Sequence, residues 1–251
     1  MFDAQEALRQ PAPFVLDTLT SRALQFSLGD IQSQMRLDDP EALDLDYTRL
    51  MMGFLLFQPT PARLAMIGLG GGSLAKFCFR HVPCADIDVI EINAQVIDLR
   101  DQFHVPPDDA RFRVLQADGA RFVRQQAGTV DVLIVDGFDD QGQPDSLASQ
   151  AFYDDCLGCL TADGVLVVNL HTGHECHAAH VDRIRRSFDD RLLLVESEED
   201  GNTIAFAFKD NAPLARRRGA RCRPARLDEG AAASLRAAFA SIERALQEAR
   251  P

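Results

Sequence analysis

The sequence predicts an α/β fold in which a Rossmann-like, mostly parallel sheet of seven strands, with an antiparallel last strand, follows a small N-terminal β-hairpin unit. Two observations predict it. Short apolar runs alternate with helical stretches from residue 64 to residue 188, which is typical of right-handed βαβ crossovers and a parallel sheet. The next two apolar runs, 192–197 and 203–209, have no helix between them, so the last strand is expected to run antiparallel to its neighbours.

The chain of 251 residues divides into three parts by composition and periodicity. Residues 1–46 are the expected N-terminal β unit, with extended segments over 14–36 and a hairpin signal at Gly29-Asp30. Residues 47–210 are the expected Rossmann-like domain, and residues 211–251 a basic linker with a C-terminal amphipathic helix. This length suits one large α/β domain with small additions at both ends.

The central part is expected to begin with a helix over 47–57, which Pro59 ends. Each of the next five apolar runs is a strand followed by a helical stretch. The strands are expected at 64–68, 85–92, 111–118, 130–136 and 164–170, and the helices at 73–81, 93–103, 119–126, 149–160 and 181–188.

The C-terminal segment differs in composition from the rest. Residues 211–226 are rich in Arg, Pro and Ala, which is typical of a solvated linker. Residues 231–249 carry apolar side chains at helical spacing, namely Leu235, Phe239, Ile242 and Leu246. We expect this helix to dock on the domain or on a second subunit.

Charge and composition exclude several classes of protein. The formal net charge of -12 repels phosphate backbones, so nucleic acid is not expected as a partner. The polar N-terminus is unlike a signal peptide, and no apolar run approaches the about 20 residues that span a bilayer. The six cysteines follow no secreted framework, so they are expected to be reduced thiols in a cytoplasmic protein without a membrane partner.

A glycine-rich turn follows the strand at 64–68 and opens the next helix. Its glycines, which let the backbone approach a ligand closely beside free helix N–H groups, are Gly68, Gly70, Gly71 and Gly72. Such a turn alone is a weak signal, because many sheets use one only to turn tightly. NAD is one candidate ligand, although the spacing is not a clean GxGxxG.

Acids at the ends of the next two strands strengthen the case for a nucleotide. Glu91, followed by Ile92, comes about 20 residues after the turn, where a carboxylate accepts both ribose hydroxyls. Asp118, followed by Gly119, ends the third strand within reach of an adenine amino group. Because the carboxyl ends of parallel strands meet at one edge, we expect these groups around one ligand, and an S-adenosyl nucleotide fits them better than NAD.

Asp136 and Asp139 follow the fourth strand, beside the expected nucleotide. Alkyl transfer from a sulfonium to an amine needs a neutral nitrogen in line with the leaving thioether. One carboxylate can accept a proton from that nitrogen, and a second can hold a distal ammonium. Asp is also common in turns, so a loop cap at Asp136 and solvated turn residues beyond it are the alternative.

With these motifs, residues 64–170 resemble the spermidine synthase family of polyamine aminopropyltransferases, and the likeness extends over most of 14–210. The resemblance implies that Glu91 binds ribose, Asp118 adenine, Asp136 the attacking amine and Asp139 the far amine of the acceptor. It also implies roles for Tyr47 and for Gln34, or Gln32, in the N-terminal unit. The expected donor is S-adenosylmethionine or its decarboxylated form, the acceptor an amine or polyamine, and the assembly a homodimer or larger homo-oligomer.

The chain departs from the family at several positions. Gly71 occupies the place of the family's acid that holds the donor's aminopropyl amine, and Thr48-Arg49 replaces a His-Glu pair. A methyltransferase that uses intact S-adenosylmethionine on the same scaffold is therefore an alternative, and a catalytically silent nucleotide-binding relative is another.

Histidines and cysteines give two further patterns. His171, His174, Cys176, His177 and His180 follow the fifth strand, but His174, His177 and His180 step by threes and diverge on a helix, so no metal is expected. A role in shaping the acceptor pocket is the better interpretation. Cys156 and Cys159 have CxxC spacing within an apolar helix and are expected to be packed thiols.

Overall fold

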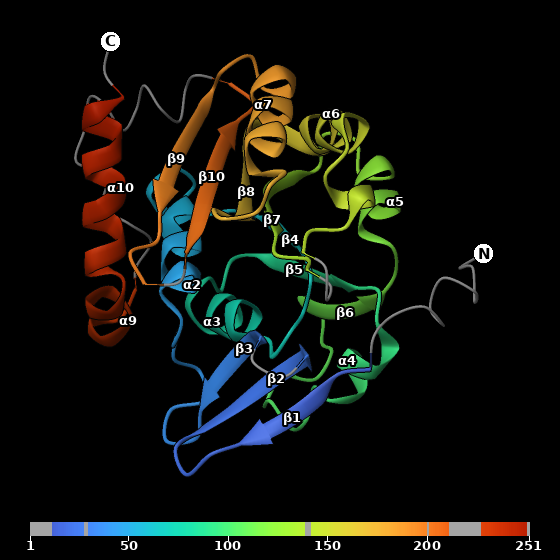
Figure 1. Cartoon of the computed structure of the whole chain (residues 1–251), viewed down its shortest axis with the longest axis vertical. Coiled ribbons are helices and arrows are strands. Elements are labelled where there is room, and N and C mark those ends of the chain that lie inside the picture. Colours follow the sequence, from blue (N-terminus) through green and yellow to red (C-terminus); the bar gives the residue numbers. More distant parts are fainter. Residues whose placement is uncertain (1–11, 28–29, 139–141, 200, 211–226, 250–251) are drawn as a thin grey trace.

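A seven-stranded sheet forms the centre of the computed structural model, which describes residues 12–27, 30–138, 142–199, 201–210 and 227–249 (Figure 1). The strand order is β6-β5-β4-β7-β8-β10-β9. Neighbours from β6 to β8 are parallel, whereas β10 is antiparallel to both β8 and β9, as predicted. The strands are β4 Arg63–Ile67, β5 Asp86–Glu91, β6 Phe112–Gln116, β7 Val130–Val135, β8 Leu160–His171, β9 Leu192–Glu196 and β10 Asn202–Phe208.

A separate three-stranded antiparallel sheet precedes it, in the order β1-β2-β3. The predicted hairpin is formed by β2 (Ser21–Ser27) and β3 (Asp30–Arg36), and β1 (Phe14–Asp17) adds a third strand. Figure 1 shows this small sheet next to α3 and α4, across from the upper half of the molecule. It therefore forms a wall beside the carboxyl ends of the central strands.

Helices cover both faces of the large sheet. They are α2 Asp46–Met51, α3 Ser73–His81, α4 Ala94–Asp98, α5 Gly119–Arg124, α6 Gln150–Cys159, α7 His177–Ser187, α9 Glu229–Ser234 and α10 Arg236–Glu248, with 3₁₀ turns η1 Met52–Leu56 and η2 Asp145–Leu147. Successive residues of β4 belong to two different apolar clusters: Met66 packs with α3, and Ile67 lies in the cluster of α5, α6 and α7. This alternation is the period of a strand that is buried on both faces.

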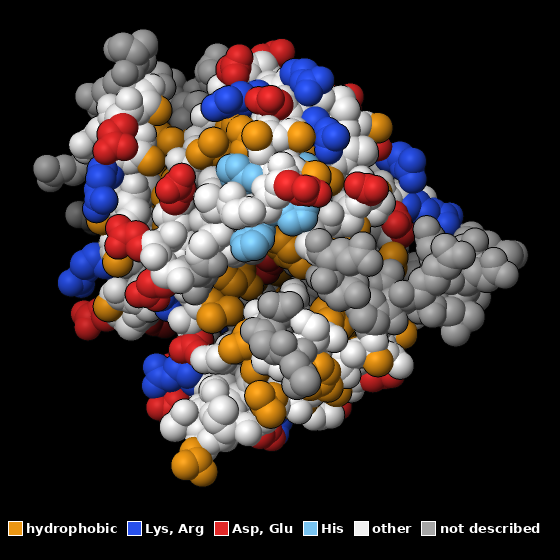
Figure 2. Space-filling view, in the orientation of Figure 1, with side chains coloured by type: hydrophobic (Ala, Val, Ile, Leu, Met, Phe, Trp, Pro, Cys, Tyr) orange, Lys and Arg blue, Asp and Glu red, His pale blue; other side chains and the backbone are white. Residues whose placement is uncertain are grey.

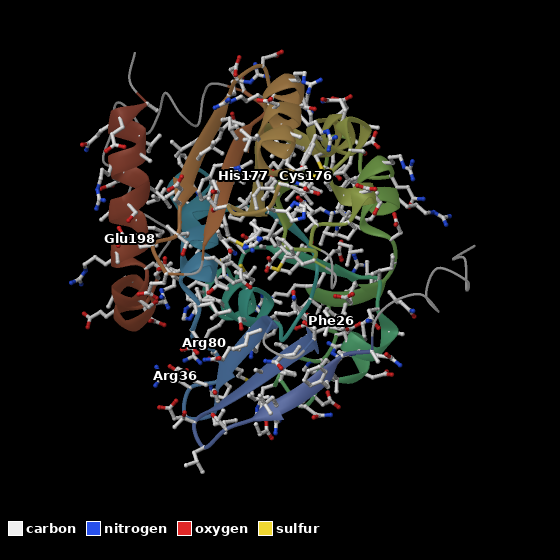
Figure 3. The ribbon with its side chains drawn as sticks, viewed as in Figure 1. Phe26, Arg36, Arg80, Cys176, His177 and Glu198 are labelled. Carbon is white, nitrogen blue, oxygen red and sulfur yellow. The ribbon has the colours of Figure 1, made fainter. Side chains whose placement is uncertain are left out.

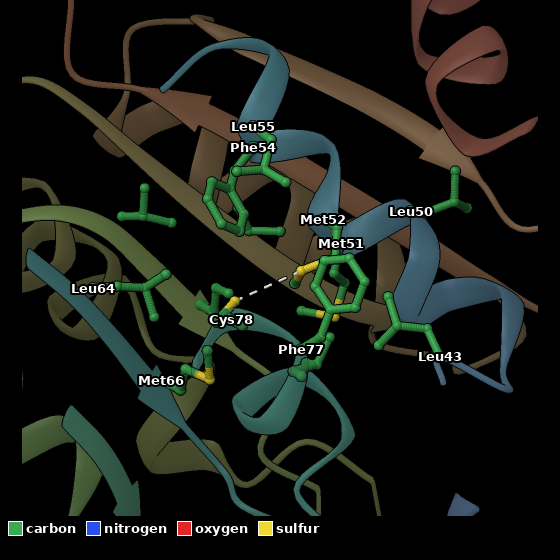
Figure 4. Close-up of a cluster of buried hydrophobic side chains, with 14 of the residues drawn as sticks. Leu43, Leu50, Met51, Met52, Phe54, Leu55, Leu64, Met66, Phe77 and Cys78 are labelled. Atoms are coloured by element: carbon green, nitrogen blue, oxygen red, sulfur yellow. Dashed lines mark hydrogen bonds between the residues drawn. The ribbon is translucent and has the colours of Figure 1, made fainter. Parts of the chain in front are cut away.

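The first of these clusters packs α2 and η1 against α3 and the sheet. Figure 4 shows Met51 and Met52 beside Phe77 and Cys78, with the Cys78 thiol 3.7 Å from the Met52 sulfur. All four side chains are buried. The helical segment predicted over 47–57 is thus present as α2 and η1, because the apolar residues of both turns face this core.

The C-terminal helix docks on the same domain. Leu235, Ile242 and Leu246 of the predicted stripe are buried, and Phe239 packs against their cluster. The helical segment divides at Leu235 into α9 and α10, and Figure 1 places α10 along β9. The predicted linker at 211–226 lies outside the described residues.

The largest differences in length from the prediction are in two elements. The helix expected over 93–103 is reduced to α4, because the backbone N–H groups of Leu99 and Arg100 bond to the carbonyls three residues earlier and the chain turns. The strand expected over 164–170 is longer, since β8 continues past a register shift opposite Val130 and Val132. Within the described residues, no helix has the length and apolar character needed to cross a bilayer.

Candidate active site

A cavity of about 660 Å³ lies where the central strands end and the N-terminal sheet faces them. Figure 2 shows a hollow in the middle of this face, bordered by histidine side chains and lined by apolar ones. In Figure 3, Phe26 on β2 and the pair Cys176 and His177 at the start of α7 lie on opposite sides of this region. The cavity thus has walls from the small sheet and from the β8–α7 connection.

The glycine turn brings the backbone against the end of β7. Gly68 has φ of 97°, and a Cβ there would lie 2.3 Å from the backbone oxygen of Asp136. Gly70 and Gly72 also have positive φ, at 51° and 71°. Only glycine satisfies both requirements at position 68, the left-handed backbone and the close approach. Gly68 and Gly70 line the cavity.

Gly71 and Gly72 form the turn without lining the cavity. A Cβ on Gly71 would lie 2.7 Å from the Ser33 hydroxyl and 2.9 Å from the ring of Phe103, which is buried. Packing therefore closes position 71, at which the sequence resemblance places an acid in other proteins. Lys76 supports this wall, because its buried ammonium donates a 2.8 Å hydrogen bond to the Phe103 carbonyl.

Glu91 ends β5 and faces the cavity from beneath the glycine turn. Its two carboxylate oxygens accept backbone N–H groups, one from Leu69 at 2.9 Å and one from Asn93 at 2.8 Å. Burial raises the pKa of Glu91, and the backbone hydrogen bonds oppose that shift. A carboxylate has about four acceptor sites, so these bonds fix its orientation and leave capacity for a ligand's hydroxyls.

Asp118 caps the helix that follows β6. Its Oδ1 accepts the backbone N–H of Arg121 at 2.6 Å, which fixes the side chain at the start of α5. Ile92, Asp118 and Gly119 all line the cavity with Glu91. The structure therefore brings both predicted acids to one cavity, at the ends of neighbouring strands.

Asp136 lies at the end of β7, partly buried against three elements. Its Oδ1 accepts a 2.9 Å hydrogen bond from Asn169 Nδ2, and its Oδ2 accepts a longer one of 3.5 Å from the Tyr47 hydroxyl. Desolvation raises the pKa of Asp136 from 3.8 to about 6, although the bonds from Asn169 and Tyr47 lower it. A carboxylate with this pKa is an anion near neutral pH and is still basic enough to accept a proton.

The predicted residues of the first 50 positions also reach the cavity. Tyr47 is buried on α2, and Gln34 projects from β3, where its Nε2 donates a 2.5 Å hydrogen bond to Asp44. Gln32 lines the cavity as well. Asp139 lies outside the described residues, so the acceptor role assigned to it stays a prediction.

Sequence reasoning missed several residues of the cavity. Asn169 on β8, Asn202 on β10 and Ser33 on β3 line it and were not singled out. Asn169 was detectable in principle, since it is a polar residue at the end of an apolar run, at the sheet edge where ligands bind. Asn202 and Ser33 carry no such local signal.

The histidines divide between the cavity and the start of α7. His171 and His174 line the cavity, and the rings of His174 and His180 stack with centroids 6.5 Å apart. Among the described residues, no group of three or more His, Cys, Asp or Glu side chains is arranged to hold a metal ion. The CxxC thiols are buried in α6, and burial raises the pKa of both, that of Cys159 to about 11, so they are packed thiols.

The strand order reverses its direction between β4 and β7, and the cavity lies at that point. Sheets of this topology bind nucleotides at such a switch point. By its strand order and by the position of its cavity, the protein has the fold of the class I S-adenosylmethionine-dependent type.

Comparisons with known proteins identify the family. A family model described as the spermine/spermidine synthase domain matches residues 45–190. A polyamine aminopropyltransferase of Chromobacterium violaceum is 37% identical over 194 residues, covering 77% of this chain and 74% of the relative. The chain therefore belongs to the spermine/spermidine synthase family.

Solved structures agree on the fold. A probable spermidine synthase from Corynebacterium glutamicum matches with a TM-score of 0.68 at 18% identity, over 91% of each chain. Human methyltransferase-like protein 13 in complex with SAH matches with a TM-score of 0.60 at 23% identity, over 82% of this chain and 95% of that one. At these identities the likeness concerns the fold alone.

Proposed function

We propose that this protein transfers an aminopropyl group from decarboxylated S-adenosylmethionine to an amine of a polyamine-type acceptor. The observation that carries the proposal is the charge of the cavity. Its described lining contains the carboxylates of Glu91, Asp118 and Asp136 and no Lys or Arg side chain. Intact S-adenosylmethionine would bring a carboxylate into this lining, whereas the decarboxylated donor and its acceptor are both cations.

The adenosyl part of the donor is assigned to the acids and the glycine turn. Glu91 accepts the ribose hydroxyls, Asp118 accepts the adenine amino group, and the backbone at Gly68, Gly70, Ile92 and Gly119 approaches the nucleoside. The support is that these residues line one cavity at the switch point of the sheet.

Asp136 and Tyr47 are assigned to the acceptor. The acceptor's nitrogen attacks the donor's methylene carbon, the C–N bond forms as the C–S bond breaks, and the electron pair of that bond goes to sulfur. The proton that the nitrogen must lose goes to the carboxylate of Asp136. The pKa of about 6 keeps this carboxylate unprotonated at neutral pH.

The amine of the decarboxylated donor needs a hydrogen-bond acceptor on the protein other than a side chain at position 71, because packing closes that position. Gln34 supplies one: its Nε2 is engaged by Asp44, and so its Oε1 is the end of the amide left for an ammonium group. Gly71 also favours the second candidate function, methyl transfer from intact S-adenosylmethionine, since it removes an acid that would oppose the donor's carboxylate.

Incubation with each donor and a panel of diamines, read by mass spectrometry, tests the proposal. We expect aminopropylated amine and methylthioadenosine from the decarboxylated donor only. Asp136→Asn should lower kcat by about 10²- to 10⁴-fold, which is the usual contribution of a general base to the rate. The same substitution at exposed Asp98 is the control and should leave kcat unchanged. A methylated product from the intact donor would establish methyl transfer instead.

Thermal shift separates binding from chemistry. A bound ligand stabilises in proportion to the logarithm of its concentration over its Kd, so the decarboxylated donor should raise Tm more than the intact one. A cytoplasmic location and a homodimeric or larger assembly stay predictions from the sequence.

A further inference from the structure

Three side chains at the ends of three adjacent strands form a continuous chain of hydrogen bonds in the lining of the cavity. Asn202 Nδ2 on β10 donates to Asn169 Oδ1 on β8 at 2.9 Å, and Asn169 Nδ2 donates to Asp136 Oδ1 at the end of β7, also at 2.9 Å. Asn169 is only 3% exposed. These bonds cross the sheet in the order of its strands, β10-β8-β7.

The chain has a direction. A primary amide presents a donor at one end and an acceptor at the other, and a half turn of the amide exchanges them. An ionised carboxylate only accepts, so Asn169 must present its NH₂ group to Asp136 and its oxygen to Asn202. Because Asn202 donates to that oxygen, it opposes the half turn that would place an oxygen against the carboxylate.

We propose that Asn202 is a positioning residue that acts through Asn169 to hold Asp136 ready to accept a proton on Oδ2. The inference rests on the proposed function for its use of Asp136 as the base. Asn169 donates to Oδ1 at 2.9 Å, whereas Tyr47 donates to Oδ2 at 3.5 Å, so Oδ2 is the oxygen with the weaker hydrogen bond and receives the proton released by the attacking amine. This chain of hydrogen bonds from Asn202 through Asn169 to Asp136, which we call the relay, thus selects which carboxylate oxygen of Asp136 reacts.

The other groups around Asp136 give no substitute for the relay. Its backbone N–H bonds to the Ile67 carbonyl of β4, and Tyr47 of α2 makes the longer contact to Oδ2. Among the titratable groups on the described lining, Glu91 and Asp118 are acids, and His171 and His174 come from the end of β8 and the segment before α7. Of the side-chain hydrogen bonds from Asn169 and Tyr47 that favour the ionised form of Asp136, the 2.9 Å bond from Asn169 is therefore the shorter.

The test measures the pKa of Asp136 directly in Asn202→Leu, by ¹³C NMR of labelled aspartate carboxyls. The Asp136 signal is assigned by its loss in Asp136→Asn. Without a hydrogen-bond donor at position 202, the Asn169 amide turns by half a turn in part of the molecules. The pKa of Asp136 should then rise by about half a unit or more. The acidic limb of the kcat/KM profile should move by the same amount, with KM for the donor unchanged.

Two further variants keep the test sharp. Asn202→Asp replaces a hydrogen-bond donor by a hydrogen-bond acceptor of the same shape, so it should raise the pKa of Asp136 further. This variant takes the place of Asn202→Leu if the latter does not fold. Thr203→Val is the matched control, since it removes the neighbouring hydrogen bond of β10, that to Thr172 at 2.9 Å, without touching the relay. It should leave the pKa unchanged.

The outcomes are distinct. An unshifted Asp136 signal in Asn202→Leu, or an equal shift in Thr203→Val, overturns the relay whatever the activity of the enzyme. Because the NMR measurement needs no substrate, a shifted signal in an enzyme that transfers no group to any amine supports the relay and overturns the proposed function instead.

Discussion

Asp136 is held as an anion in a place where little water solvates it. Folding raises its pKa from 3.8 to about 6, so the native state binds the proton more tightly than the unfolded chain does. The contribution of Asp136 to the stability of the protein therefore falls as pH rises through the interval between these two values, and it does not recover above pH 6. A shift of this size corresponds to about 3 kcal/mol, which is the cost of keeping the base ionised.

Asp136→Asn should accordingly be more stable than the parent protein at pH 8, by up to about 3 kcal/mol, while it loses activity. The amide oxygen still accepts from Asn169, and the buried charge is gone. Urea unfolding at pH 8 and near pH 4.5 measures the difference, which should shrink at the lower pH because the parent carboxyl is then protonated. A variant that is less stable than the parent at pH 8 contradicts this account.

Gly68 is the residue at which the backbone permits no side chain. Gly68→Ala should destabilise the protein by about 2 kcal/mol or more, because the Cβ meets the backbone oxygen of Asp136 and φ is 97°. Gly158→Ala in α6 is the matched control: apart from its chain neighbours and the backbone of its own helix, no atom lies within 4 Å of its added Cβ, so it should stabilise by about 0.5–1 kcal/mol. Urea unfolding compares the two, and equal effects would exclude this explanation.

At the scale of elements, α10 is predicted to contribute to stability through one face. Ile242 is fully buried, and its side chain fills the space beside Gly53 and Phe206. Ile242→Ala should therefore cost about 2–4 kcal/mol through lost burial and the cavity left behind. Gln247→Ala, on the exposed face of the same helix, should change stability by less than about 0.5 kcal/mol.

Denaturant unfolding followed by circular dichroism measures both variants. If they are equally stable, the helix does not contribute through the face that the structure buries.

The helices and strands of this fold were predictable where the periodicity of apolar residues and the residues that end each element indicated the same boundaries. The alternation of strands and helices and the missing crossover before β10 defined the large sheet, and the stripe through Ile242 marked the buried face of α10. The helix expected over 93–103 was too long, because its apolar spacing continues through a turn in which the hydrogen bonds tighten. Periodicity reports which side chains are buried and not where the backbone turns.

The candidate site was predictable only where its residues lie at the end of a strand or just after it. Glu91, Asp118 and Asp136 do so, and the parallel sheet brings their positions together. Asn169 and Asn202 lie 33 residues apart, and only the antiparallel register of β8 and β10 brings their amides within hydrogen-bond distance. The packing of Ser33 and Phe103 against Gly71 depends likewise on how the small sheet and the turn after α4 meet the glycine turn.

For the whole molecule, charge is expected to act on the acceptor before it reaches Asp136. The chain carries a formal net charge of -12, and the described lining of the cavity has acids and no Lys or Arg. The field of such a surface attracts a cation over a distance of about one Debye length, which is about 30 Å at 0.01 M salt and 8 Å at 0.15 M.

The kcat/KM for a diamine should therefore fall by about tenfold as salt rises from about 0.01 M to 0.3 M, with kcat itself little changed. A monoamine of similar length carries half the charge and should lose less. Steady-state rates for both acceptors over the same salt series measure the effect. A salt dependence that is the same for the two amines would mean that salt acts on the enzyme or the donor, and rates that rise with salt would show that the field opposes the acceptor.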